Sequence, residues 1–108
     1  MYSIVNLIGS TKYEDIFRSL ERQLSISGYL VFSPLVYNQS GDKPGCGEDI
    51  KVILDNEANL KTNLSNIVFV VDVDGYIGNS TKKQIEHAKL LNKPVLYYSK
   101  GDLEKLTK

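Results

Sequence analysis

Two short segments of the chain place a glycine and small hydroxyl-bearing residues just before a stretch that is typical of a helix. They read Gly9-Ser10-Thr11-Lys12 and Gly78-Asn79-Ser80-Thr81. The first N–H groups of a helix have no partner within it and lie at the positive end of its dipole, so both segments could bind an anion such as a phosphate. The alternative is that Ser10, Asn79, Ser80 and Thr81 only cap their helices, a common use of these residue types.

Further side chains close to the second segment could contact a ligand. Asp72 and Asp74 follow an apolar run, and either could accept a hydrogen bond from a ligand hydroxyl or act as a base, although Asp-Val-Asp before a glycine is also ordinary turn chemistry. The ring of Tyr76 could stack on a base or cover the site. Gln84 stands three residues after Thr81, so it could complete a capping box, contact a sugar, or do both.

The hydrophobic pattern divides the chain into alternating strands and helices. Apolar runs predict strands at residues 3–9, 29–32, 67–71 and 94–98. Apolar spacings of three and four predict a helix that ends at Gly28, a second over residues 48–64 and a third over about 80–91. Residues 38–47, rich in glycine, indicate a loop, and residues 101–108 a short helix or a tail.

This alternation is typical of a three-layer α/β domain with a parallel sheet. The run Ile67–Val71 is apolar without alternation, which indicates a strand buried on both faces. We predict one Rossmann-like, flavodoxin-like domain over residues 1–108, with about four strands in the order 2-1-3-4. Ligands bind such sheets beyond the carboxyl ends of the strands, where the chain order reverses, so segments 9–12 and 78–81 are predicted to open onto one cleft.

Composition argues against several classes of protein. The 108 residues carry 13 Lys plus Arg and 13 Asp plus Glu, and this balance argues against a nucleic-acid binder, which needs a cationic surface. No apolar run approaches the roughly 20 residues of a membrane span, and the first residues do not form a secretion signal, so we expect a cytoplasmic protein. The single cysteine, Cys46, excludes an internal disulfide and a thiolate zinc site, and we expect it to be an incidental thiol. No metal or cofactor is expected.

Most of the chain outside residues 38–47 resembles the nucleoside 2-deoxyribosyltransferase-like proteins. The resemblance lies in residues 4–11, 64–71, 75–88 and 90–95, and its most specific part is Gly75-Tyr76-Ile77-Gly78-Asn79-Ser80-Thr81. It implies a flavodoxin-like fold that binds a nucleoside or nucleotide. Active members of this superfamily cleave the N-glycosidic bond between deoxyribose and base, and members usually complete their sites or cores across a subunit interface, so we expect a homodimer or larger homo-oligomer.

The resemblance also implies two acidic positions that this chain lacks. The family's chemistry uses a carboxylate nucleophile that attacks the anomeric carbon through an oxocarbenium-like transition state. The position of that glutamate, four residues before Ala88, holds Gln84, and a neutral amide is a far poorer nucleophile than a carboxylate. The second acidic position, eight residues before Asn66, holds Ala58.

The sequence therefore predicts a nucleoside- or nucleotide-binding protein whose N-glycosidic-bond chemistry is lost or altered. The alternatives are an active transferase or N-glycosidase that uses Asp72 or Asp74, and an interaction protein with a vestigial cleft. The candidate ligand-binding residues are Gly9, Ser10, Thr11, Lys12, Asp72, Gly75, Tyr76, Gly78, Asn79, Ser80, Thr81 and Gln84.

Overall fold

A computed structural model describes residues 3–34 and 48–107 of the chain, together with the side chains of 3–34 and 50–107. The predictions for the 38–47 loop and for Cys46 lie outside this part. The strands are β1 (Ile4–Gly9), β2 (Leu30–Phe32), β3 (Ile67–Val71) and β4 (Val95–Tyr97). The helices are α1 (Glu14–Ile26), α2 (Glu48–Leu64) and α3 (Asn79–Leu90), and 3-10 helices span Val73–Gly75, Tyr98–Lys100 and Asp102–Lys105.

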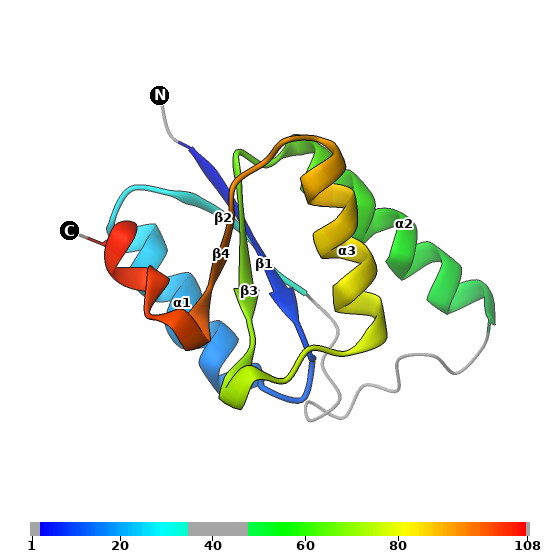
Figure 1. The fold of residues 1–108 in the computed structure, drawn as a ribbon, viewed down its shortest axis with the longest axis horizontal. Coiled ribbons are helices and arrows are strands. Elements are labelled where there is room, and N and C mark those ends of the chain that lie inside the picture. Colours follow the sequence, from blue (N-terminus) through cyan, green and yellow to red (C-terminus); the bar gives the residue numbers. More distant parts are fainter. Residues whose placement is uncertain (1–2, 35–47, 108) are drawn as a thin grey trace.

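The four strands form one parallel sheet in the order β2-β1-β3-β4, which confirms the predicted fold class and strand order (Figure 1). Helix α1 and the C-terminal 3-10 helices cover one face of the sheet, while α2 and α3 cover the other (Figure 1). The architecture fits a small Rossmann-like, flavodoxin-like domain. No helix in the described ranges is long and apolar enough to cross a bilayer.

The two faces of the central strands bury two separate clusters, because successive side chains of a strand point to opposite sides. On the α1 face, Val5, Leu7, Phe69 and Val71 pack with Phe17, Leu20, Leu24 and Leu106. On the α3 face, Ile8, Val68 and Val70 pack with Ile85 and Ala88. Burial on both faces explains why β3 is apolar at every position.

Helix α2 is tied to the sheet and to α3 partly by polar contacts. Within the buried interface, the Asn6 Nδ2 group of β1 donates to Thr62 Oγ1 at 3.1 Å. At the C-terminal end of α2, Lys93 Nζ donates to the backbone carbonyls of Asn63 (2.9 Å) and Ser65. The two bonds from Lys93 satisfy carbonyls at the end of α2 that have no partner within the helix. They also place a cation at the negative end of the α2 dipole. Together these contacts hold the C-terminal end of α2 in a defined position beside the amino-terminal half of β1.

The carboxyl ends of β1 and β3 are neighbours, and this decides where a site can form. In the parallel register Ile8 is paired with Val70 and Gly9 with Val71, so both strands end at the same edge of the sheet. The chain leaves β1 toward α1 on one face and leaves β3 toward α3 on the other (Figure 1). Such a point of reversed connection is where open α/β sheets bind ligands.

The C-terminal segment contributes a carboxylate whose charge should make stability depend on pH. The backbone N–H of Tyr97 donates to Asp102 Oδ2 at 2.9 Å, and Lys105 Nζ lies 3.2 Å from Oδ1. The bond from Tyr97 is the main reason that the pKa of Asp102 lies below its ordinary value of 3.8; burial acts in the opposite direction, and Lys105 and Lys100 lower the pKa further. The folded chain therefore keeps this carboxylate charged at a lower pH than the unfolded chain does.

Because the folded pKa is depressed, the stabilisation by Asp102 is present above the unfolded pKa of about 4 and is lost as the pH falls through the folded pKa. Asp102→Asn keeps an oxygen acceptor for Tyr97 but carries no charge. We expect the free energy of unfolding to fall less steeply below about pH 4 in this variant than in the wild type. Urea titrations at about pH 5, 4 and 3 measure the two slopes, and equal slopes would contradict the expectation.

Candidate functional site

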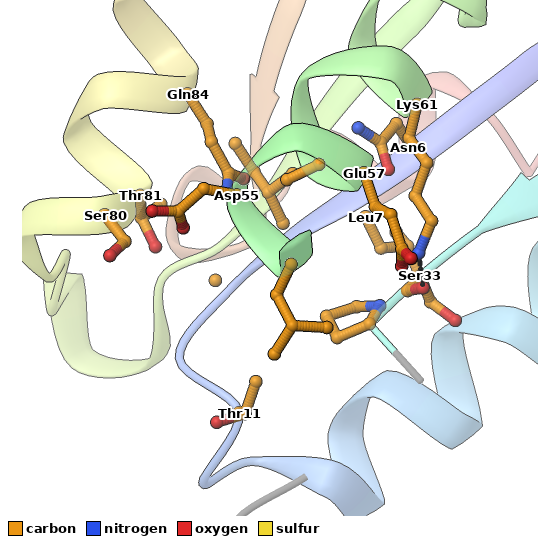
Figure 2. A pocket seen from close by; sticks show the side chains of 15 residues that line it. Asn6, Leu7, Thr11, Ser33, Asp55, Glu57, Lys61, Ser80, Thr81 and Gln84 are labelled. Carbon is orange, nitrogen blue, oxygen red and sulfur yellow. Dashed lines mark hydrogen bonds between the residues drawn. The ribbon is translucent and has the colours of Figure 1, made fainter. Parts of the chain in front are cut away.

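A pocket of about 190 Å³ opens at the carboxyl edge of the sheet, between β1, α2 and the start of α3 (Figure 2). Its floor comes from β1, where Asn6, Leu7, Ile8 and Gly9 line it. Thr11 follows on one side, and Ser80, Thr81 and Gln84 of α3 lie on another. Residues of both segments singled out from the sequence therefore line the same pocket, which confirms that the two open onto one cleft.

In the first segment, Gly9 and Thr11 line the pocket, whereas Ser10 and Lys12 do not. The Ser10 Oγ atom accepts a long hydrogen bond of 3.4 Å from the backbone N–H of Lys12. The Lys12 Nζ atom lies 4.4 Å from the centre of the Tyr76 ring and 5.2 Å from that of Tyr13. This cation–π contact links the two segments to each other.

The prediction that the two segments only cap their helices is wrong. The residue before α1 is Tyr13 and the residue before α3 is Gly78, and neither helix start receives a side-chain capping hydrogen bond. Because Gly78 occupies the N-cap position, Thr81 and Gln84 lie within the helix and do not form a capping box across its start. The two side chains are thus not committed to α3's own backbone groups, and both line the pocket.

The acids at the end of β3 are placed away from the pocket lining. Asp72 is buried, and its two carboxylate oxygens accept hydrogen bonds from the backbone N–H (2.8 Å) and the hydroxyl (2.6 Å) of Ser99. Asp74 is exposed, and its φ of 54° places it in the left-handed region of a tight 3-10 turn. Asp72 therefore anchors the end of β3 to the segment after β4, and neither acid lines the pocket.

The remaining candidate residues in and just before the second segment lie outside the pocket lining. Tyr76 is half exposed, with its ring beneath Lys12. A Cβ atom added to Gly78 would lie 3.4 Å from Tyr76 Oη, so the phenol folds back over that glycine. Gly75 has a φ of 79° and completes the turn that carries the ring. Gly75, Tyr76, Gly78 and Asn79 are close in sequence to the pocket but do not line it.

Helix α2 contributes charged residues that the sequence analysis did not single out. Asp55, Glu57 and Lys61 line the pocket together with Leu54 and Ala58. Figure 2 shows Asp55 on the side of Thr81 and Gln84, and Glu57 with Lys61 on the side of Ser33. The sequence signal that could have found the two acids is their position, since both lie within the turn of the helix that precedes Ala58.

The β2 side of the pocket is held by a set of polar contacts. Lys61 Nζ donates to the backbone carbonyl of Ser33 at 2.9 Å, and Ser33 Oγ donates to Glu21 Oε2 of α1 at 2.6 Å. Ser33 is itself buried, so both contacts are partly shielded from water. They join α2, the end of β2 and α1, and they fix the position of Lys61 at the pocket.

A second hollow of about 170 Å³ adjoins the pocket between α2 and α3. It shares Asp55, Ser80 and Gln84 with the pocket and adds Lys51, Asn59 and Lys83. Asp55 and Gln84 thus lie at the border between the two hollows. No group of three or more His, Cys, Asp or Glu residues within the described ranges could hold a metal ion.

The two positions where the resemblance implies acids both face the pocket. Gln84 and Ala58 come from different helices and line the same space. The chain matches no protein-family model and no curated protein.

Proposed function

We propose that the chain binds a nucleoside or nucleotide in this pocket, as a nucleoside 2-deoxyribosyltransferase-like protein with weakened or lost N-glycosidic-bond chemistry. The observation that carries the proposal is that Gln84 and Ala58 line one pocket with Gly9, Thr11, Ser80 and Thr81. Five of these six residues, all but Ala58, belong to the segments from which the resemblance was drawn. Hydroxyl and amide groups on one side and apolar side chains on the floor suit a sugar joined to a flat base.

Within this proposal, Gln84 can bind a sugar but cannot replace a carboxylate nucleophile. Its amide can donate and accept hydrogen bonds with ligand hydroxyls, yet it is neutral and forms no stable ester with an anomeric carbon. The alternative of catalysis by Asp72 or Asp74 is not favoured, because Asp72 already accepts two hydrogen bonds from Ser99 and Asp74 is outside the pocket lining. An open, partly polar pocket also gives no support to a vestigial cleft.

One experiment separates the three functions. The protein is incubated with a panel of 2′-deoxynucleosides and their monophosphates, free base is measured by chromatography, and thermal stability is recorded in the same samples. Stabilisation without base release is the expected result. Release of base at a rate well above the blank would instead show an active enzyme, and the absence of both signals would favour an interaction protein.

We also propose that the chain forms a homodimer through an exposed apolar stripe on α2. Ile53, Leu60 and Leu64 are 55%, 58% and 64% exposed and recur at spacings of seven and four, so they share one side of the helix. Ile50, 44% exposed, continues the stripe toward the start of the helix. Exposed apolar residues in one row on a helix are typical of an interface between subunits.

Leu60→Glu is expected to weaken this self-association by about a hundredfold or more, because it places a charge where apolar area is removed from water. Sedimentation velocity over a concentration series measures the change. Leu90→Glu is the matched control, since Leu90 is 82% exposed on α3 and is not part of the stripe. If the wild type is monomeric at all concentrations, or if both variants behave alike, the stripe is not the interface.

A further inference from the structure

The polar residue at the centre of β1, Asn6, is buried on the face of the sheet that α2 and α3 cover. Val5 and Leu7 pack on the α1 face, and Ile8 packs on the α3 face. The alternation of the strand therefore places Asn6 on the same side as Ile8. Asn6 is 1% exposed and lines the floor of the pocket. A buried carboxamide needs hydrogen-bond partners for its nitrogen and for its oxygen, because burial removes both atoms from water.

The protein itself uses the nitrogen of this carboxamide. The Asn6 Nδ2 atom donates to Thr62 Oγ1 at 3.1 Å, and this bond ties β1 to α2. Among the residues that the structure describes, none donates a hydrogen bond to Asn6 Oδ1. In the same part of the chain, no fully enclosed side-chain nitrogen or oxygen atom lacks a partner, so the Oδ1 atom must reach the open space of the pocket. Anchoring α2 thus accounts for the nitrogen of Asn6 and leaves its oxygen available to a ligand.

Ser33 presents a second acceptor at the same end of the pocket. Asn6 is paired with Phe32 in the sheet, so Ser33 follows directly beside it, and Ser33 also lines the pocket. The Ser33 hydroxyl proton is committed to Glu21 Oε2 at 2.6 Å, which leaves its Oγ atom with lone pairs only. The β2 side of the pocket therefore favours a ligand group that donates hydrogen bonds.

Two acceptors in this position favour an amino group as the donor. An exocyclic amino group of a base has two protons, whereas the ring N–H of uracil has one proton and lies between two carbonyl oxygens that would face the acceptors. Lys61 Nζ gives one of its three protons to the Ser33 carbonyl at 2.9 Å and keeps two for an acceptor on the same ligand. In adenine and cytosine, the amino group stands next to a ring nitrogen that is such an acceptor.

We propose that Asn6 is a specificity-determining residue, whose Oδ1 atom accepts a hydrogen bond from the amino group of an adenine or cytosine base. The inference rests on the proposed function and names the class of base that the same site takes. It also orients the ligand. Figure 2 shows Asn6 and Ser33 across the pocket from Gln84, so the base lies toward β2 and the sugar toward α3.

The experiment compares, by calorimetry, the dissociation constants of 2′-deoxyadenosine and of purine 2′-deoxyriboside, which lacks only the amino group. The wild type is expected to bind 2′-deoxyadenosine about five- to tenfold more tightly, the effect of one hydrogen bond made in a buried site. The double variant with Asn6→Leu and Thr62→Val is expected to reduce this ratio to near one. It replaces both partners of a buried hydrogen bond with apolar groups of similar size, which keeps the fold stable, and its melting temperature checks this.

Thr107→Val is the control for the loss of a threonine hydroxyl, since Thr107 Oγ1 donates to the Leu103 carbonyl at 3.0 Å near the C-terminus, away from the pocket lining. It should leave the wild-type ratio unchanged. Equal affinities of the wild type for the two purine nucleosides, or an unchanged ratio in the double variant, would overturn the inference and leave the proposed function standing. Tighter binding of 2′-deoxyuridine than of 2′-deoxycytidine by the wild type would also overturn it, because the carbonyl would then be preferred to the amino group. Failure of all four nucleosides to bind would overturn both proposals.

Discussion

Gln84→Glu is expected to raise the rate of base release from a bound 2′-deoxynucleoside by about a hundredfold or more. The change replaces a neutral amide with a carboxylate of nearly the same shape, at a position that lines the pocket beside Ser80 and Thr81. A carboxylate can attack the anomeric carbon and form a glycosyl-enzyme, which divides one difficult step into two easier ones. Chromatographic measurement of free base over time, with substrate in excess, gives the rate.

Two controls define what this result means. Gln84→Met removes the amide without adding a nucleophile, so it should release no more base than the wild type. Glu86→Gln changes a charge on the same helix at an exposed position outside the pocket lining and should have no effect. If Gln84→Glu binds the nucleoside as well as the wild type does but releases no base, then Ala58 or the shape of the pocket also limits the reaction.

Gly9→Ala is expected to reduce the free energy of unfolding by about 2–4 kcal/mol. Gly9 has a φ of 152°, which residues with a Cβ atom rarely adopt. A Cβ atom at this position would lie 2.7 Å from the backbone oxygen of Val71 and 3.3 Å from Cζ of Phe17. Since Val71 is held in β3 beside β1, the backbone must shift at the edge of the sheet that forms the pocket. Urea unfolding measures the loss of stability.

Gly101→Ala separates the two causes of that loss. Gly101 also has a positive φ, 72°, but a Cβ atom there would have no neighbour within 4 Å. We expect this variant to lose only about 1–2 kcal/mol, the cost of the left-handed backbone itself. Equal losses in the two variants would show that the close approach of Gly9 to Val71 is not destabilising. Gly9→Ala should also weaken ligand binding, because Gly9 lines the pocket.

The strands, helices and sheet order follow from features that are local in the sequence. Apolar spacing predicts a strand at 67–71 and helices at 48–64 and 80–91, and the structure has them at Ile67–Val71, Glu48–Leu64 and Asn79–Leu90. Parallel strands joined by right-handed crossovers leave few arrangements for a chain of this length. For the same reason the meeting of segments 9–12 and 78–81 at one edge could be predicted without coordinates.

The contacts of single side chains depended instead on the tertiary structure. The sequence places Asp72 at the correct edge of the sheet, but only the folded chain brings Ser99, 27 residues later, within hydrogen-bonding distance of both its oxygens. Asp55 and Glu57 belong to a helix that the sequence predicts, yet their place in the pocket depends on how α2 is rotated against β1. That rotation is set by long-range contacts such as Asn6 with Thr62 and Lys93 with Asn63, which a local pattern does not encode.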